Sequence, residues 1–290
     1  MSAAAGQSSA TGGMFISRGQ ATLFLGGALL FMLLFFVGPM LLIVWGSLQS
    51  PSGDALANYK HFFSDAYYWR VLVNTLTMSM WATLITFVLG YTLSYYMNFH
   101  VKSPLVRRAI YIIVVLPLFT SNIVRSFGWI VLLGREGIIN QTMMATGLTS
   151  GPVQLLYTNG SIIVALAYVM LPFMILTLNS IFQNINPSVI EASRDLGAGP
   201  IVTFLKVTFP LSLPGVVAGS LIVFTLCVSA YVTPSIMSGG RVTVMPVLIY
   251  DYYMVQLDFG MGATLAVVLL ATTIAIIGGY MFILRRYSQR

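Results

Sequence analysis

The stretch NPSVIEASRDLGAGP, residues Asn186–Pro200, decides the fold, because it predicts a short helix between two long apolar segments. Ser188 and Glu191 have the spacing of a capping box, and Pro187 suits the first turn of a helix. Gly197 is expected to end this helix in the left-handed conformation. A helix of about two turns is marginal alone in water, so we expect it to lie in a groove on a partner. One apolar-to-small stripe is predicted along it: Val189, Ala192, Ser193 and Leu196.

The rest of the chain is very apolar. Only 7% of its 290 residues are charged and 58% are hydrophobic, whereas about a quarter of the residues are charged in an ordinary soluble domain. This composition excludes a disordered chain, a coiled coil, a nucleic-acid-binding domain and almost any cytosolic enzyme. The single cysteine, Cys227, excludes an internal disulfide and a multi-cysteine metal site. We therefore expect an all-α integral membrane protein.

Six apolar segments without charges are candidates for membrane-spanning helices, which need about 20 residues each. Together they predict a six-helix transmembrane domain over residues 21–284, with a flexible tail at 1–20 and a basic tail at 285–290. Pro117, Pro172 and Pro234 are expected inside the third, fourth and fifth helices, where they would break backbone hydrogen bonds. The predicted spans are 21–48, 71–97, 109–124, 160–182, 211–237 and 261–284.

The few charges separate by side of the membrane. With six spans, both tails and the second and fourth loops share a side that carries nine cations and two acids, Glu191 and Asp195. The other side carries five of each, so the net charges are +7 and 0. The positive-inside rule places both termini in the cytoplasm. The cations of the first side are Arg18, Lys102, Arg107, Arg108, Arg194, Lys206, Arg285, Arg286 and Arg290, and those of the second are Lys60, Arg70, Arg125, Arg135 and Arg241.

The predicted spans lack the residues that carriers use for ion coupling. None contains an acid, a histidine or a lysine, which proton-coupled transporters place at membrane depth. The chain also has no Gly-x-x-x-x-Gly-Lys-Ser/Thr loop for ATP phosphates and no His/Cys cluster for a metal. The driving force must come from a partner protein, or the chain uses none. A secondary carrier or channel stays open as an alternative. A membrane enzyme or an assembly scaffold is a weaker alternative.

The short helix resembles a known motif. Glu191-Ala192-Ser193, then Gly197, then Val207-x-Phe209-Pro210 are similar to the EAA loop of the membrane subunits of binding-protein-dependent ABC importers. Ser193, Val207 and Phe209 depart conservatively from that pattern. The resemblance implies a type I ABC importer permease fold, in which the loop 183–210 presents a cytoplasmic coupling helix to an ATPase subunit. The implied coupling residues are Glu191, Ala192, Ser193, Asp195 and Gly197; Glu191 and Gly197 would also serve as ordinary helix caps.

Further stretches, 116–125, 128–140, 171–176 and 231–234, look like the spermidine/putrescine branch of this family. The resemblance implies a permease in the bacterial inner membrane for a polyamine or a related small solute. The implied partners are ABC ATPase subunits, a second, homologous permease chain, a periplasmic solute-binding protein and membrane lipid, with no nucleic acid. This chain would be no enzyme and would hold no cofactor, because ATP and Mg are bound by the ATPase.

By resemblance, the solute pathway runs between two permease subunits. Serines and threonines there could equally join helices, and tyrosines and tryptophans could form the interfacial belt. Arg125 is costly at membrane depth but would repel a polyamine, so it fits a gate or a helix cap better. Asp251, among tyrosines, could attract an ammonium group, contact the binding protein or lie at the headgroups. The candidates are Ser121, Asn122, Arg125, Trp129, Tyr168, Ser229, Tyr231, Thr233 and Asp251.

Overall fold

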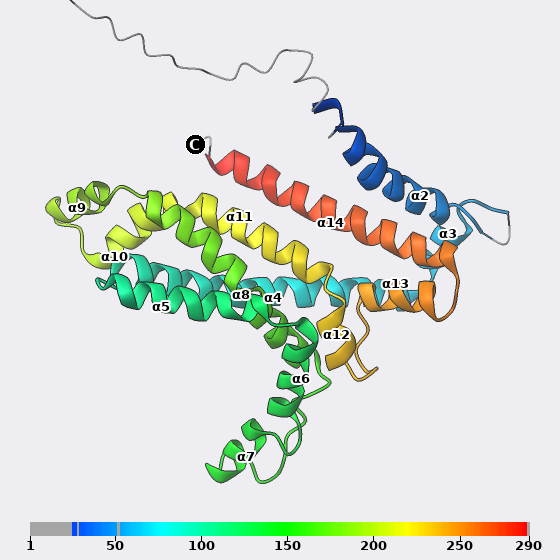
Figure 1. Ribbon diagram of the computed structural model, residues 1–290, viewed down its shortest axis with the longest axis horizontal. Helices are drawn as coiled ribbons and strands as arrows, with labels where there is room; N and C mark the ends of the chain where they lie inside the picture. Colours follow the sequence, from blue (N-terminus) through cyan, green and yellow to red (C-terminus); the bar gives the residue numbers. More distant parts are fainter. Residues whose placement is uncertain (1–24, 28, 51–52, 289–290) are drawn as a thin grey trace, which may run out of the picture.

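The computed structural model describes residues 25–27, 29–50 and 53–288, which form helices joined by short loops (Figure 1). Five helices are long and apolar enough to cross a membrane, or six if one bent pair counts as a single span. The expectation of an all-helical membrane protein is therefore confirmed, and the predicted number of six spans is reached when the bent pair counts as one. The predicted tail 1–20 and the last two residues of the basic tail lie outside the described residues.

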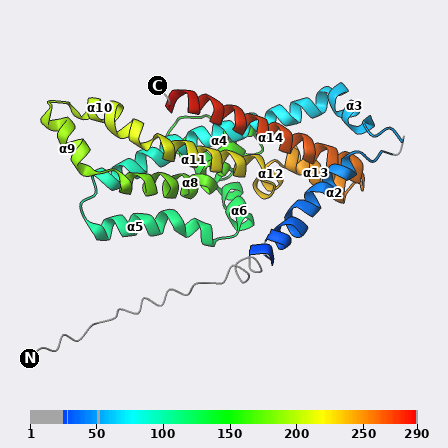
Figure 2. The ribbon, with the colours of Figure 1, turned by 90° about the horizontal axis from the view of Figure 1, so that it is seen from above.

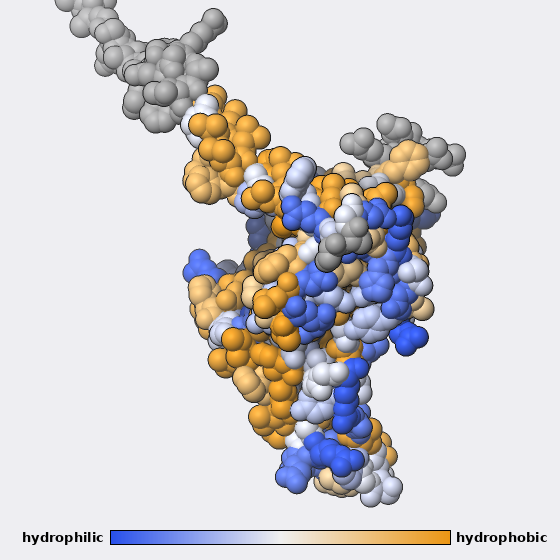
Figure 3. Space-filling model, turned by 90° about the vertical axis from the view of Figure 1, so that its right-hand side faces the viewer, coloured by the Kyte–Doolittle hydropathy of each residue, from blue (hydrophilic) through white to orange (hydrophobic). Residues whose placement is uncertain are grey.

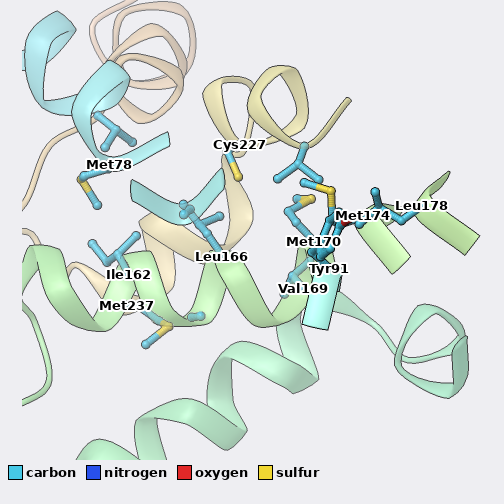
Figure 4. Close-up of a cluster of buried hydrophobic side chains, with 14 of the residues drawn as sticks. Met78, Tyr91, Ile162, Leu166, Val169, Met170, Met174, Leu178, Cys227 and Met237 are labelled. Carbon is cyan, nitrogen blue, oxygen red and sulfur yellow. The ribbon is translucent and has the colours of Figure 1, made fainter. Parts of the chain in front are cut away.

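Three long helices form the centre of the molecule: α4 (Ala66–Phe99), α8 (Asn159–Asn184) and α11 (Phe209–Val228). Their contacts are close because small residues face larger ones. A Cβ atom at Gly90 of α4 or at Gly219 of α11 would lie 2.7 Å from Met174 of α8, and small residues are typical of tightly packed membrane helices. Figure 4 shows Met174 beside Tyr91 and Leu178 in the buried cluster that joins these helices.

The first and last spans pack together at one end. The N-terminal helix comprises a π-helical turn, η1 (Leu33–Val37), and α2 (Gly38–Ser47), while α14 (Phe259–Ser288) is the last span. The Thr264 hydroxyl of α14 donates to the Ser47 carbonyl at 3.2 Å. Towards its N-terminus the first helix diverges from α14, as both ribbon views show (Figures 1 and 2). Most of its apolar side chains are exposed, as expected for a surface that faces lipid or another subunit.

Two short helices complete the end at which α2 meets α14: α3 (Ala57–Ser64) and α13 (Met245–Met254). Figure 1 shows this end opposite α9 (Pro187–Asp195). Viewed end-on, hydrophilic residues gather on it and hydrophobic surface flanks them (Figure 3). That distribution fits a bundle whose sides lie in lipid and whose ends reach water.

The third predicted span, 109–124, has the wrong bounds. The helix α5 (Pro104–Val115) tightens into a 3-10 turn, η2 (Leu116–Phe119), which contains Pro117. After a break the chain continues as α6 (Asn122–Leu133) and α7 (Ile138–Ala145), bent by 102° from the segment before it. The apolar residues run on through the break, so composition alone did not reveal it. Figure 1 shows α6 and α7 leaving the bundle sideways.

The fifth predicted span, 211–237, is also displaced. The helix starts much earlier, as α10 (Pro200–Thr203) and a π-helical turn, η3 (Phe204–Thr208), and runs into α11. Pro200 begins a helix here. A proline prevents the preceding helix from continuing, but it also fits the first turn of a new helix. The last part of the predicted loop 183–210 is thus the start of a span. Beyond Val228 the chain breaks, and α12 (Val232–Met237) holds Pro234 outside the span.

Candidate functional site

The helix α9 is held at both ends by its own backbone and side chains. At its start the Asn186 side chain accepts a hydrogen bond from the Ser188 amide at 3.1 Å. The predicted capping box on Ser188 is therefore wrong: Asn186 caps the helix and Ser188 lies inside its first turn. At its end Gly197 has a φ of +82°, and its amide donates to the Arg194 carbonyl at 2.8 Å. This is the left-handed stop that was predicted, completed as a Schellman motif by Ala198.

The predicted stripe on α9 does not form one face. Ile190 is the buried residue of the helix and Ser193 is half-buried, so these two point towards the rest of the molecule. Val189 and Leu196 are exposed, Leu196 by 88%. The exposed coupling candidates are Glu191, Ala192, Asp195 and Gly197. The helix thus has an inner face that attaches it and an outer, mixed face that is open to a partner.

The inner face of α9 packs on the start of the long fifth span. It contacts α10 and η3, and the Ser193 hydroxyl lies 3.0 Å from the Thr203 hydroxyl. The next residue, Phe204, places its ring edge-on to Tyr91 and Tyr95 of α4, at 5.9 and 5.3 Å between centroids. The helix α9 is therefore connected through packed side chains to α4, and through η3 to α11.

These supporting residues were not predicted from the sequence. Asn186 followed by Pro187 is a recognised helix start, and it could have been preferred to the Ser188 capping box. The contact of Phe204 with α4 had no signal in the sequence, because it joins segments more than one hundred residues apart. The same holds for the Tyr91 hydroxyl, which lies 2.9 Å from the Ser212 hydroxyl of α11.

The pathway candidates around the break in the third span lie at the start of α6. Ser121 caps this helix by accepting from the Ile123 amide at 3.3 Å. The Asn122 side chain accepts a hydrogen bond from Nη2 of Arg125. The protein covers Nε and Nη1 of Arg125, and neither has a hydrogen-bond partner among residues 25–27, 29–50 and 53–288. Arg125 therefore supports the start of α6, and two of its nitrogen atoms beside the break have no hydrogen-bond partner among the described residues.

The other candidates join neighbouring helices in pairs. Trp129 of α6 stands edge-on to Tyr168 of α8 at 5.7 Å. Thr233 of α12 is buried, with its hydroxyl 3.5 Å from that of Ser126 on α6. These contacts bring together α6, α8 and α12, the elements next to both breaks.

The remaining candidates lie towards α13. The ring of Tyr231, at the start of α12, lies 4.8 Å from that of Tyr250 on α13. Ser229, in the break itself, is exposed and donates to the Thr225 carbonyl at 3.1 Å. Asp251 of α13 accepts a hydrogen bond at 2.7 Å from Gln256, which follows this helix, so it is engaged locally rather than with the other candidates.

Residues 86–289 match the protein family described as "Binding-protein-dependent transport system inner membrane component". The chain belongs to this family. It is therefore a multi-pass permease subunit of a binding-protein-dependent ABC importer in the bacterial inner membrane. A permease of this family is not an enzyme and binds no cofactor; a separate ATPase binds ATP. The membership decides against the secondary carrier and the membrane enzyme.

Similar proteins extend over most of the permease. The "Spermidine/putrescine transport system permease protein PotB" of Haemophilus influenzae is 32% identical over 244 residues, which cover 81% of this chain and 84% of that protein. A bacterial ABC transporter for the import of the acidic polysaccharide alginate contains a chain of the same fold, with a TM-score of 0.76, 19% identity and coverage of 92% and 95%. A bacterial alginate ABC transporter in complex with an alginate pentasaccharide-bound periplasmic protein contains a chain with a TM-score of 0.75 at 18% identity, covering 92% of this chain and 94% of that chain. These neighbours confirm the permease fold.

Proposed function

We propose that this permease forms the pathway by which a polyamine such as putrescine or spermidine, or a related small organic solute, enters the cell. A periplasmic solute-binding protein delivers the solute, and ATP hydrolysis by partner subunits drives its passage. The 32% identity with a spermidine/putrescine permease over most of both chains supports the solute class.

The observation that carries the coupling part of the proposal is the construction of α9. The helix is capped at both ends, attached by Ile190 and Ser193 to the start of a span, and open on its outer face. A preformed helix with one free face suits docking into a groove, because little conformational entropy is lost on binding. Glu191, Ala192, Asp195 and Gly197 of the motif lie on this outer face, while Ser193 joins the helix to the span.

The charge distribution supports an orientation with α9 and both termini in the cytoplasm. Lys102, Arg107 and Arg108 belong to the same side as α9 in the six-span topology. Cations on short loops favour the cytoplasmic side and contact anionic headgroups. The exposed apolar surface of the first span and of α5 and α6 suits lipid and a second, homologous permease chain.

We further propose that the solute passes beside the two breaks. Irregular backbone at membrane depth is tolerated where it lines a water-filled cavity. Ser121, Asn122 and Arg125 lie at one break, and Ser229 and Tyr231 lie at the other. Trp129, Tyr168, Thr233 and Asp251 occupy the neighbouring helices. Arg125 serves as a gate or a positioning group, since its charge repels a polyamine.

Transport by the reconstituted complex tests the proposal. The permease would be co-expressed with its partner permease and ATPase, placed in proteoliposomes and supplied with the binding protein and radiolabelled putrescine or spermidine. We expect uptake to require ATP on the side of the membrane where the ATPase lies. Glu191→Lys should abolish uptake, whereas Ser188→Ala, on the same helix, should preserve it. Uptake driven by an ion gradient without ATP, or full uptake by Glu191→Lys, would refute the coupling. Saturable transport of unrelated solutes, with none of polyamines, would refute the solute class.

A further inference from the structure

A pocket of about 300 Å³ lies where three loop segments meet, next to the ends of α6, α8 and α12. Arg135 follows α6, Gln154 and Tyr157 precede α8, and Arg241 lies between α12 and α13. The remaining lining is apolar: Leu133, Val153, Leu155 and Leu156. Two exposed arginines from distant parts of the sequence thus line one small cavity.

Tyr157 forms a strained wall of this pocket. Its φ of +63° is unusual for a residue with a side chain. Its ring fits against Gly239, where a Cβ atom would lie 2.5 Å from the ring. The Arg241 guanidinium lies 5.7 Å from the ring centroid on a cation–π contact. Such strain persists only where the surroundings impose it, and it is concentrated at binding sites.

The two arginines have no anionic partner within the described residues. The ion pair found among residues 25–27, 29–50 and 53–288 joins Lys60 to Asp54 at 2.6 Å. There the Lys60 hydrogen bond holds the pKa of the Asp54 carboxyl below its usual value. In contrast, neither Arg135 nor Arg241 pairs with a carboxylate, and no acid lines their pocket. A planar guanidinium prefers a carboxylate or a phosphate in a bidentate contact.

We propose that Arg135 and Arg241 bind an Asp or Glu side chain of the solute-binding protein when it docks on the permease. The proposal rests on the proposed function, in which α9 faces the cytoplasm and the binding protein docks on the other side of the membrane, where the six-span topology places the loops of Arg135 and Arg241. The apolar lining suits the hydrocarbon stem of a side chain better than a free inorganic anion, and the volume admits one such side chain. The pocket is present in the permease without a partner, which limits the entropy lost on docking.

Binding of the solute-loaded binding protein to the full transporter in proteoliposomes tests the proposal. We expect Arg135→Glu/Arg241→Glu to raise the Kd at least tenfold, as for close charge pairs at interfaces, and to remove the stimulation of ATPase activity. The basal ATPase activity should be unchanged, because the variant leaves α9 intact. The milder Arg135→Gln/Arg241→Gln serves as a second variant should the glutamates impair folding. Arg70→Glu, an exposed cation of α4 outside the pocket, is the matched control and should bind like the wild type.

The outcomes separate the proposal from its alternatives. Wild-type affinity should fall with added salt more steeply than the affinity of the glutamine variant. Unchanged binding by both double variants, with normal stimulation of the wild type, would overturn the docking site alone. If the double variants bind the binding protein normally but lose stimulated ATPase activity only in vesicles that contain anionic lipid, the docking site is overturned and the pocket binds a headgroup phosphate instead. A wild-type complex that no binding protein stimulates would refute the proposed function itself.

Discussion

The hydroxyl of Ser193 on α9 lies 3.0 Å from the hydroxyl of Thr203 on α10. Thr203 is buried, and it directly precedes the Phe204 ring that stands against α4. The hydrogen bond therefore fixes the orientation of the proposed coupling helix relative to the span it precedes. It also provides a way to loosen that connection without altering the outer face of α9.

Thr203→Val should weaken the connection between α9 and the span. The variant keeps the shape of the side chain and removes a hydrogen bond of about 1 kcal/mol. We expect the number of solutes imported per ATP hydrolysed to fall severalfold, with basal ATPase activity retained. Thr92→Val, which removes an exposed hydroxyl bonded to its own helix, is the control. Equal ratios for the two variants would refute a role for this contact.

Gly197→Val should disturb the end of α9, because a β-branched residue is strained at a φ of +82°. The site is open, with no atom within 4 Å of a Cβ, so backbone strain rather than a clash causes the effect. Gly197→Asn should be milder, since asparagine tolerates this conformation. Gly199→Ala is the control, because Gly199 has a φ of −68° and equal space. ATP-driven uptake should decrease in the order Gly199→Ala, Gly197→Asn, Gly197→Val, and another order would contradict the strain argument.

Gly215→Ala should destabilise the contact of α11 with α8 by roughly 1–3 kcal/mol, the usual cost of overpacking. The added Cβ would lie 2.7 Å from Cγ1 and 3.1 Å from Cβ of Ile181, a stiff β-branched residue. Gly219→Ala also brings its Cβ to 2.7 Å, but from the Sδ atom of Met174, with Thr177 no nearer than 3.6 Å, and methionine can move aside. Thermal aggregation in detergent should therefore begin at a lower temperature for Gly215→Ala than for Gly219→Ala. The reverse order would refute this packing.

Arg125→Gln should change uptake more than Asn122→Ala does. If Arg125 served only to hold Asn122, the two variants would act alike, since both lose the same hydrogen bond. Nε and Nη1 of Arg125 have no partner among the described residues, so the guanidinium has donors left for water or solute. The Michaelis constant and the maximum rate of uptake would be compared for both variants, with Arg125→Lys to test whether charge alone suffices. Identical kinetics for the two variants would reduce Arg125 to a helix-capping group.

Cys227 should resist a maleimide in the native transporter, because it is only 3% exposed within the central cluster. It should react after denaturation. Ser229→Cys, made in a Cys227→Ser background, should be labelled without denaturation, since Ser229 is exposed in the break after α11. Rapid labelling of native Cys227, or protection of the new cysteine in the isolated subunit, would contradict the described end of α11.

Local signals predicted the ends of helices well where one residue carries the geometry. Gly197 was predicted as a left-handed stop, and its φ confirms it. Pro172 was predicted inside the fourth span and lies within α8. At the start of α9 two capping signals competed, and Asn186 prevailed over Ser188 because a proline already occupied the first turn. The sequence offered both possibilities but not their relative strength.

The breaks in the third and fifth spans could not be placed from hydrophobicity. Apolar residues continue past Ser121 and past Ser229, and hydropathy measures composition rather than direction. What turns the chain at Ser121 is a capping side chain followed by contacts between α6 and α12. The same limit applies to the candidate sites: Ser193 with Thr203, or Arg135 with Arg241, become neighbours only once the chain is folded.

The π-helical turn η3, at Phe204–Thr208, has a consequence for how α9 and α11 are aligned. A π-turn holds an extra residue compared with an α-helical turn. Deleting one residue from η3 would leave a regular, fully hydrogen-bonded helix, yet it would rotate α9 by about 100° relative to the packed face of α11. The extra residue thus sets the rotation of α9 about the axis of the span, relative to the packed face of α11. One such deletion would misalign the ATPase docked on α9 with the pathway, although every side chain of the outer face of α9 and of the packed face of α11 would still be present.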